Sequence, residues 1–305
     1  MVYQYENAGN NQRIYKEVGS DKKLKWDAAQ VDPDTKRLID EVVAQGYVII
    51  KNAFTDAEVD EALEELRRLS ASSDAGPAAT RGRNTFEGFK TQRIYSLLNK
   101  SRVFDKFTIH PSVVALNDYF MDPGWLLSVI HSISIQPGEK PQTLHHDDGQ
   151  ITIPRPHRPL GSAIMVALDP YTELNGATVV VPESHTWGAD RVPQVSEARP
   201  VVMPRGSLVY FIGTLWHGGG QNRSDAARRA LTVQYCQPWL RQLENYFIAV
   251  DWEKLPQIPK QIVDMMGYQV GSPFIGFVDG VNPRKAVEQR LKRKGEEEKA
   301  KRNKL

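Results

Sequence analysis

Hydrophobic positions in the first part of the chain recur with the period of a helix. Over residues 33–45 apolar side chains fall three and four positions apart, and Gly46 follows where such a helix would end. The apolar run 47–50 predicts a short buried strand. Thr55 begins a capping-box pattern that opens a second helix. We therefore expect a mainly helical region over residues 33–125.

The pattern changes near residue 125 to short β-rich runs separated by Pro, Gly and Asn. No helix-length pattern lies between these runs, which argues against parallel βαβ units. The sequence predicts a mainly β fold with flanking helices, whose core is a double-stranded β-helix (a cupin-like jelly roll) over residues 126–240. The expected strands are 127–135, 162–168, 178–181, 201–203, 207–212 and 230–235.

The same pattern predicts one principal domain. It covers residues 33–250, after an N-terminal extension at 1–32 and before a helical segment with a charged tail at 251–305. In that tail Lys and Arg alternate with Glu, as on a solvated helix.

Composition narrows the functional classes. Charged residues make up 25% of the chain and the net charge is +2, which does not favour nucleic acid or an anionic membrane as a partner. A single cysteine, Cys236, indicates a reducing compartment, so we expect a cytoplasmic protein. The last residues, 303–305, are similar to a peroxisomal address but begin with an atypical Asn, which leaves the peroxisome as the alternative. No apolar run is long enough for a transmembrane helix.

The candidate chemistry lies in two separated motifs. The first is the run 142–148 (Gln-Thr-Leu-His-His-Asp-Asp), and His217 follows 70 positions after Asp147, just before three glycines. A His-x-Asp pair with a distant second His is the spacing of the facial triad that binds non-haem Fe(II) and leaves positions open for a cosubstrate and dioxygen. Glycines next to His217 permit close approach of the backbone.

The register within the first motif stays open on periodicity alone. If the motif is a strand, residues two apart face the same side, so His145 could act with Asp147, or His146 with Asp148. An iron site of this kind needs a cation for the remote carboxylate of its cosubstrate. Arg228 opens the last β-rich run and could provide this cation. Its neighbour Arg229 should then point to the other face of the strand.

At these motifs the chain resembles the phytanoyl-CoA dioxygenase-like family of Fe(II)/2-oxoglutarate oxygenases. The family pattern Gln-x-Leu-His-x-Asp matches residues 142–147, and a pattern of the type Asn-Gly-Ala-Thr followed by Ser-His-x-Trp matches within 173–187. A third block spans residues 217–235. Leu174 and Glu183 depart from the family pattern, outside the expected metal ligands.

The resemblance implies specific roles. It selects His145, Asp147 and His217 as the iron ligands and Arg228 as the residue that binds the far carboxylate of 2-oxoglutarate. Polar contacts to the cosubstrate are implied for Gln142, Thr178 and, from a looser alignment, Arg93. Implied cofactors are Fe(II), 2-oxoglutarate and dioxygen. The implied reaction is oxidation, by hydroxylation or desaturation, of a small organic substrate, and secondary metabolism is one setting for it. For the oligomeric state, a homodimer is an open alternative.

Two other classes compete with this interpretation. A non-catalytic jelly-roll binding protein would be expected to lack a ligand or the cosubstrate arginine, and all four positions are present. A zinc-dependent hydrolase could use the same His and Asp ligands, because these side chains also bind zinc.

Overall fold

The computed structural model describes residues 31–82, 84–271 and 273–302. Most of the predicted N-terminal extension and all of residues 303–305 lie outside these ranges. The helices in chain order are α1 (Pro33–Gln45), α2 (Asp56–Ser70), α3 (Leu97–Lys100), α4 (Pro111–Phe120), α5 (Tyr246–Ala249), α6 (Lys260–Met265) and α7 (Pro283–Arg302).

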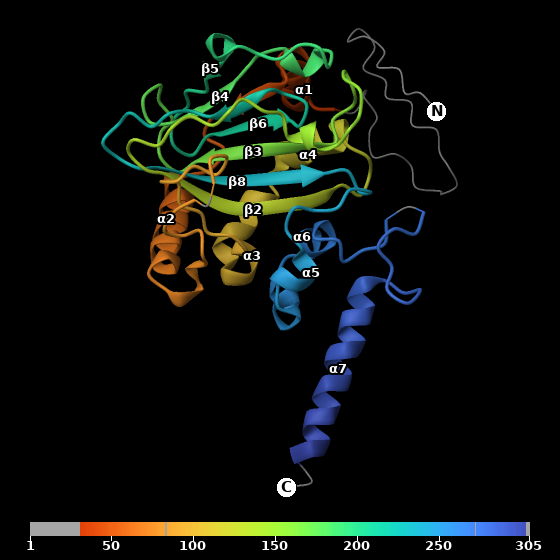
Figure 1. Ribbon diagram of the computed structural model, residues 1–305. Helices are drawn as coiled ribbons and strands as arrows, with labels where there is room; N and C mark the ends of the chain where they lie inside the picture. The colour runs from red at the N-terminus through yellow and green to blue at the C-terminus, as the bar shows by residue number, and fades with distance from the viewer. Residues whose placement is uncertain (1–30, 83, 272, 303–305) are drawn as a thin grey trace.

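Two antiparallel sheets form the centre of the molecule (Figure 1). The large sheet has five strands in the order β1-β6-β3-β8-β2, and the small sheet has three in the order β5-β4-β7. Antiparallel pairing of strands agrees with the short connections that the sequence indicated. The strands are β1 (Tyr47–Ile50), β2 (Leu126–Ile135), β3 (Gly161–Ala167), β4 (Thr178–Val180), β5 (Arg199–Pro200), β6 (Leu208–Ile212), β7 (His217–Gly219) and β8 (Arg228–Cys236).

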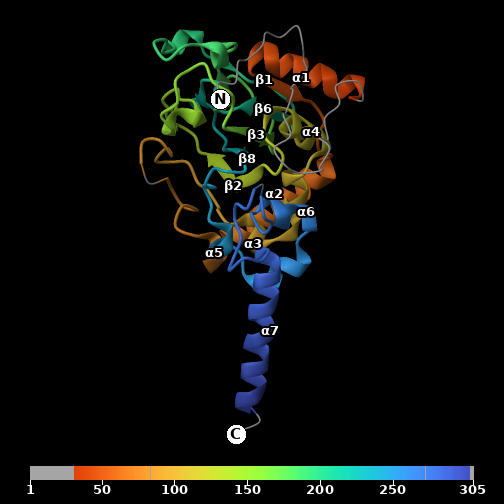
Figure 2. The ribbon, with the colours of Figure 1, turned by 90° about the vertical axis from the view of Figure 1, so that its right-hand side faces the viewer.

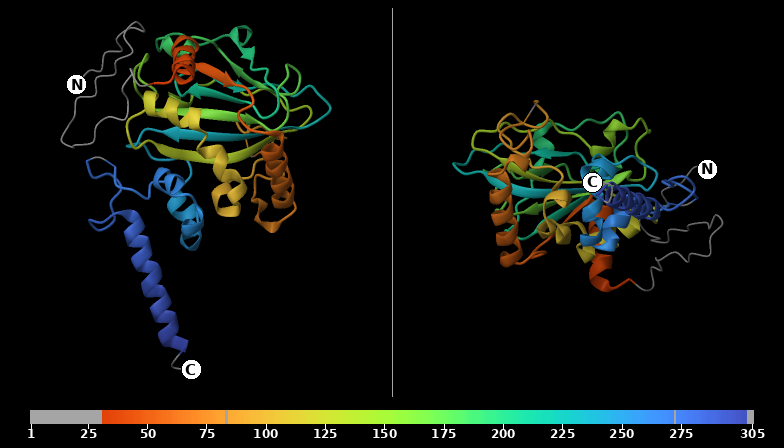
Figure 3. Two further views of the ribbon diagram at one scale, coloured as in Figure 1. Left: turned by 180° about the vertical axis from the view of Figure 1, so that it is seen from behind. Right: turned by 90° about the horizontal axis from the view of Figure 1, so that it is seen from below.

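The large sheet is buried on both faces. Along β3, Ile164 and Val166 belong to the core that packs against the helices, whereas Ala163 and Met165 belong to a second core shared with the small sheet. This follows from the alternation of side chains along a strand. Seen from behind, α1 and α4 lie over the face of the large sheet that points away from the small sheet, and α3 lies below the β2 edge (Figure 3).

The first two helices confirm their sequence signals. Gly46 ends α1 in a left-handed conformation at φ 85° and donates its backbone N–H to the Val42 carbonyl. Thr55 and Glu58 form the reciprocal capping box that begins α2. Between them, β1 pairs with β6 and closes one edge of the large sheet.

Three details of the expected strands are wrong. Residues 201–203 are not a regular strand; the pairing partner of β4 is the preceding β5. The strand β7 was not predicted, because two of its three residues are glycines and give no apolar pattern. The motif 142–148 is also not a strand throughout, as described below. All three errors concern short segments whose pairing depends on distant parts of the chain.

The C-terminal part contains α6 and α7, with turns and isolated bridges between them. Helix α7 packs at its beginning through Ala286 and Val287 and then extends away from the rest of the molecule (Figure 2). Its exposed residues are largely charged, which fits a solvated helix. A helix apolar and long enough to cross a bilayer does not occur in the described residues.

Candidate active site

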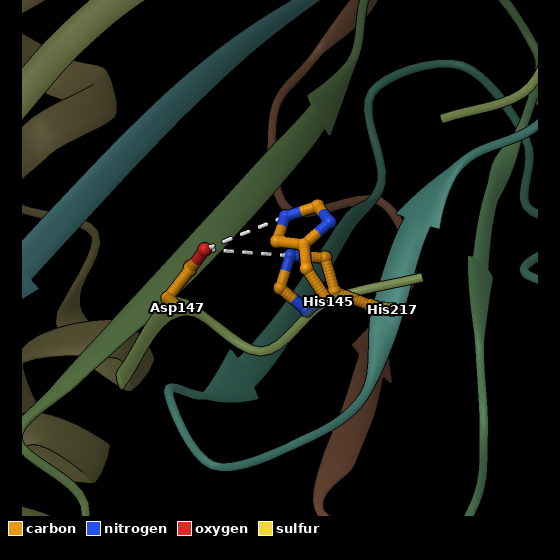
Figure 4. A group of neighbouring side chains, drawn as sticks. All are labelled: His145, Asp147 and His217. Atoms are coloured by element: carbon orange, nitrogen blue, oxygen red, sulfur yellow. Dashed lines mark ion pairs between the residues drawn. The ribbon is translucent and has the colours of Figure 1, made fainter. Parts of the chain in front are cut away.

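Three side chains from the two motifs converge at one point between the sheets. Asp147 Oδ1 lies 3.7 Å from His145 Nε2 and 3.6 Å from His217 Nε2. The three ligand atoms all lie within 4.8 Å of one another (Figure 4). Two imidazole nitrogens and one carboxylate oxygen at this separation fit around a single divalent cation.

The backbone brings the two histidines together. His145 and His217 form an antiparallel bridge in which each N–H donates to the carbonyl of the other, at 2.9 and 2.8 Å. Asp147 lies at the start of a short 3-10 helix, Asp147–Gln150. The expectation that His145 and Asp147 face one side of a strand is therefore wrong in its geometry. The turn after His145, rather than strand alternation, directs the carboxylate toward both imidazoles.

Hydrogen bonds fix the orientation of both rings. His145 Nδ1 lies 3.0 Å from the Thr143 carbonyl, and His217 Nδ1 lies 2.9 Å from the Leu215 carbonyl. A carbonyl can only accept, so Nδ1 carries the proton and Nε2 presents its lone pair to the shared point. Burial, followed by the neighbouring His217, lowers the pKa of His145, which keeps this imidazole neutral. A neutral ring is the form that binds a metal.

The alternative register does not converge. His146 packs edge-on against Trp216, with ring centroids 4.9 Å apart. Asp148 is buried and accepts the Leu160 N–H, and burial raises its pKa to about 7. Among the described residues, the side chains close enough to share one metal ion are those of His145, Asp147 and His217. His146 and Asp148 are not part of this group. The structure therefore resolves what periodicity left open.

Glycines let β4 and β7 approach each other beside the site. A Cβ added at Gly220 would lie 2.5 Å from the Ala177 carbonyl oxygen, and one at Gly219 would lie 2.9 Å from Gln142 Oε1.

We expect Gly220→Ala to separate the strands next to His217 and to weaken metal binding roughly 10- to 100-fold, the range seen when support of a ligand is lost. Metal titration monitors this effect; unchanged affinity would contradict it. Gly295→Ala is the control, because that Cβ meets no atom within 4 Å.

A large cavity opens at the three side chains. Its volume is about 960 Å³, near the upper end of the range for small-molecule sites. The walls come from the facing strands of both sheets and from the segment that contains Phe86. The Phe86 ring lies edge-on to His145, with centroids 4.8 Å apart, although 55% of its surface is exposed. The cavity can hold more than one small molecule beside the triad.

Arg228 is a buried cation at one end of this cavity. Only 1% of its surface is exposed, and it donates to the Tyr171 hydroxyl at 2.7 Å and to the Gly176 carbonyl at 2.5 Å. Its Nε has no partner in the described structure. Burial lowers its pKa, so the site is costly for a cation that lacks an anion. As predicted, Arg229 points the other way and pairs with Asp169.

The remaining predicted contacts also line the cavity. Thr178 is buried on β4 next to Tyr171. Arg93 is buried beside the edge strand β2 and donates to the Glu87 carbonyl. Gln142 accepts the Gly219 N–H and donates to the Phe86 carbonyl, both at 2.7 Å, so its amide connects β7 to the Phe86 segment.

Sequence reasoning missed Tyr171 and Phe86. Neither lies in one of the recognised motifs, and no local pattern marks a residue that reaches a site from a connecting segment. Tyr171 precedes a turn, and Phe86 lies in a loop. For both, only the folded chain shows the contact with Arg228 or His145.

Known proteins are similar to this chain in sequence and in fold. The sequence profile of the phytanoyl-CoA dioxygenase (PhyH) family matches residues 42–230, more than half of the chain. The chain belongs to the phytanoyl-CoA dioxygenase family. It is accordingly an Fe(II)/2-oxoglutarate-dependent dioxygenase, which confirms the predicted enzyme class and cofactors.

Relatives of this PhyH-family dioxygenase include fungal enzymes. Dioxygenase FUM3 of Gibberella moniliformis is 30% identical over 73% of this chain and 79% of its own length. Dioxygenase cdmA of Talaromyces verruculosus is 28% identical over 83% and 86%, respectively. Since these matches cover most of both partners, the similarity is not confined to a short motif.

Solved structures agree on the fold of this dioxygenase. The epimerase SnoN, in complex with Fe³⁺, alpha ketoglutarate and nogalamycin RO, is 22% identical with a TM-score of 0.54, over 68% of this chain and 85% of its own. The alpha ketoglutarate dependent carbocyclase SnoK from nogalamycin biosynthesis is 16% identical with a TM-score of 0.52, over 69% and 85%.

Proposed function

We propose that His145, Asp147 and His217 hold Fe(II) in this dioxygenase. The observation that carries the proposal is their convergence, with both imidazoles locked by backbone carbonyls so that Nε2 faces the carboxylate. The donor set suits Fe(II), since two histidines and one carboxylate leave coordination positions open. The large cavity beside them gives room for the ligands that would fill those positions.

We propose that Arg228 binds the far carboxylate of 2-oxoglutarate. A buried guanidinium whose described contacts are a hydroxyl and a carbonyl has donors suited to a carboxylate, and a bidentate pair would offset its desolvation. Tyr171 and Thr178 lie beside it to orient that carboxylate. Gln142 would contact the cosubstrate near the metal, and Arg93 would supply positive charge from the cavity wall beside β2.

When bound, the iron and 2-oxoglutarate with dioxygen supply oxidation of a C–H bond, with release of succinate and carbon dioxide. The residues of this chain hold the reactants and limit access of water. Phe86 covers His145 at the mouth of the cavity, and apolar side chains from β2, β3 and β6 line its floor. Hydroxylation or desaturation of the substrate is the proposed outcome.

We propose that the two sheets are the halves of a double-stranded β-helix. The support is that a shared core lies between them and the candidate ligands lie at one end of it. The catalytic domain in this proposal covers residues 33–250, with 33–125 as its helical part and 126–240 as the jelly-roll core. Residues 251–305 form an appended helical segment and tail.

The proposed substrate is a small organic molecule of secondary metabolism. Fungal dioxygenases are similar over most of their length, and the solved neighbours act in nogalamycin biosynthesis. A net charge of +2 gives no reason to add nucleic acid as a partner. We propose that the protein acts in the cytoplasm and that it forms a homodimer. Size-exclusion chromatography with light scattering tests the dimer directly.

The metal and cosubstrate are tested by absorption spectroscopy. Without oxygen, addition of Fe(II) and 2-oxoglutarate to the apoprotein is expected to produce a weak visible charge-transfer band. Zn(II) in place of Fe(II) should give no band, because zinc has a filled d shell. A protein that binds zinc tightly and Fe(II) plus 2-oxoglutarate not at all would favour the hydrolase interpretation. Binding of neither metal would favour a non-catalytic protein.

A further inference from the structure

The cavity extends along the large sheet from the level of Arg228 to the level of His131. Arg228 lies opposite Ile135, and His131 lies opposite Thr232 on the same two strands. Four residues of strand separate the two levels, which corresponds to roughly 13 Å. A five-carbon dicarboxylate held by Arg228 is shorter than this. The wall around His131 is therefore available to the substrate.

His131 is an unusual residue at that level. Its strand neighbours on the cavity side are Val129 and Ile133, so the imidazole interrupts an apolar wall. Its ring packs against Tyr95, with centroids 4.6 Å apart, which fixes its plane. Only 9% of its surface is exposed, and the cavity is where the residue is accessible.

The hydrogen bonds of His131 determine what its ring can offer. Nδ1 lies 3.1 Å from the Ser132 carbonyl and therefore carries the proton. Burial lowers the pKa of His131 to about 4, so the ring is neutral at physiological pH. Nε2 then presents a lone pair and has no hydrogen-bond partner in the described parts of the chain. His131 lines the cavity, so a ligand or water there can donate a hydrogen bond to this lone pair.

The surroundings describe the rest of the ligand. Val129, Met165, Phe211 and Leu243 give this part of the cavity apolar walls, and Phe86 adds an aromatic ring at the mouth. Thr232 and Gln234 add neutral polar groups on β8. An apolar ring system fits these walls, and one hydroxyl or N–H on it would meet the acceptor.

We propose that His131 is a specificity-determining residue that accepts a hydrogen bond from a hydroxyl or N–H group of an apolar, ring-containing substrate. This inference rests on the proposed function, since it assigns the substrate end of that same cavity. The hydrogen bond would fix the substrate about its long axis and select which C–H bond faces the iron ligands. A substrate without the donor would leave the acceptor unpaired, which is the basis of strong discrimination.

The test uses a matched pair of probes, 2-naphthol and 2-methoxynaphthalene, which share a ring system and differ in the donor proton. Binding to the anaerobic Fe(II)/2-oxoglutarate protein is measured by equilibrium dialysis. We expect 2-naphthol to bind roughly tenfold more tightly, the effect of one hydrogen bond. The variant His131→Phe should remove this preference while the affinity for 2-methoxynaphthalene stays within about twofold. The variant His131→Gln, which keeps an acceptor, should restore part of it.

His157→Phe is the matched control. Its Nδ1 also lies near the carbonyl of the next residue, at 2.7 Å from Arg158, but His157 does not line the cavity. This variant should keep the preference for 2-naphthol. Equal binding of both probes to the unmodified protein, binding of neither, or a preference that survives in His131→Phe would overturn the inference. The charge-transfer band, recorded on the same samples, separates these outcomes from failure of the proposed iron site.

Discussion

His217→Ala is expected to abolish substrate-dependent succinate formation and the visible band with Fe(II) and 2-oxoglutarate. The reason is that His217 supplies one of three ligand atoms and its Nε2 lies 3.6 Å from Asp147 Oδ1. Two remaining ligands bind a divalent ion far more weakly than three held by a rigid scaffold. His145→Ala and Asp147→Ala should have the same effect. Anaerobic titration with Fe(II), followed by a succinate assay, measures both quantities.

The control for this prediction lies next to the ligands. His146→Ala removes an imidazole that packs on Trp216 and does not face Asp147 with the others. It should keep Fe(II) binding and the band. If His146→Ala lost the iron while His145→Ala kept it, the assignment of ligands would be reversed. Circular dichroism on each variant separates loss of a ligand from loss of the fold.

Arg228→Ala is expected to raise the 2-oxoglutarate concentration required for half-maximal turnover by roughly 100- to 10,000-fold. This is the effect of losing two charge-assisted hydrogen bonds of about 1.5–3 kcal/mol each, at a tenfold change per 1.4 kcal/mol. Fe(II) binding without cosubstrate should change little, because Arg228 is not among the ligand atoms. Arg228→Lys should recover part of the affinity, since it keeps the charge but loses the bidentate geometry.

Arg229→Ala provides the comparison. That side chain is directed to the other face of β8 and pairs with Asp169, at 2.6 Å in a partly exposed position. The variant should leave the 2-oxoglutarate requirement within about twofold. A large increase for Arg229→Ala with none for Arg228→Ala would transfer the anchoring role. An unchanged requirement in both variants would move the anchoring role to Arg93.

Local patterns were sufficient for the elements whose stability is local. The helix at 33–45 and its Gly46 terminus, and the capping box at Thr55, follow from backbone hydrogen bonding within a few residues. The β-branched and apolar residues of β8 predict a strand at that position. The enzyme class was also readable, because the family motifs contain the side chains that the chemistry requires.

Residue spacing alone could not decide how the ligands meet. Periodicity assumed a strand at the first motif, but Asp147 begins a 3-10 turn, and the turn aims its carboxylate at both imidazoles. The bridge between His145 and His217 joins segments 72 residues apart, and that pairing depends on β4 and β7 as neighbours. Such long-range register has no local signature.

The sequence by itself determined the identity of the candidate ligands, the class of cofactor and the β-rich core that carries them. Only the tertiary structure decided that Asp147 reaches both imidazoles from a turn, that Arg228 is buried with a hydroxyl and a carbonyl as partners, and that His131 lines the same cavity. The physical reason is that side-chain chemistry belongs to each residue. Burial and mutual orientation belong to contacts between segments that are distant along the chain.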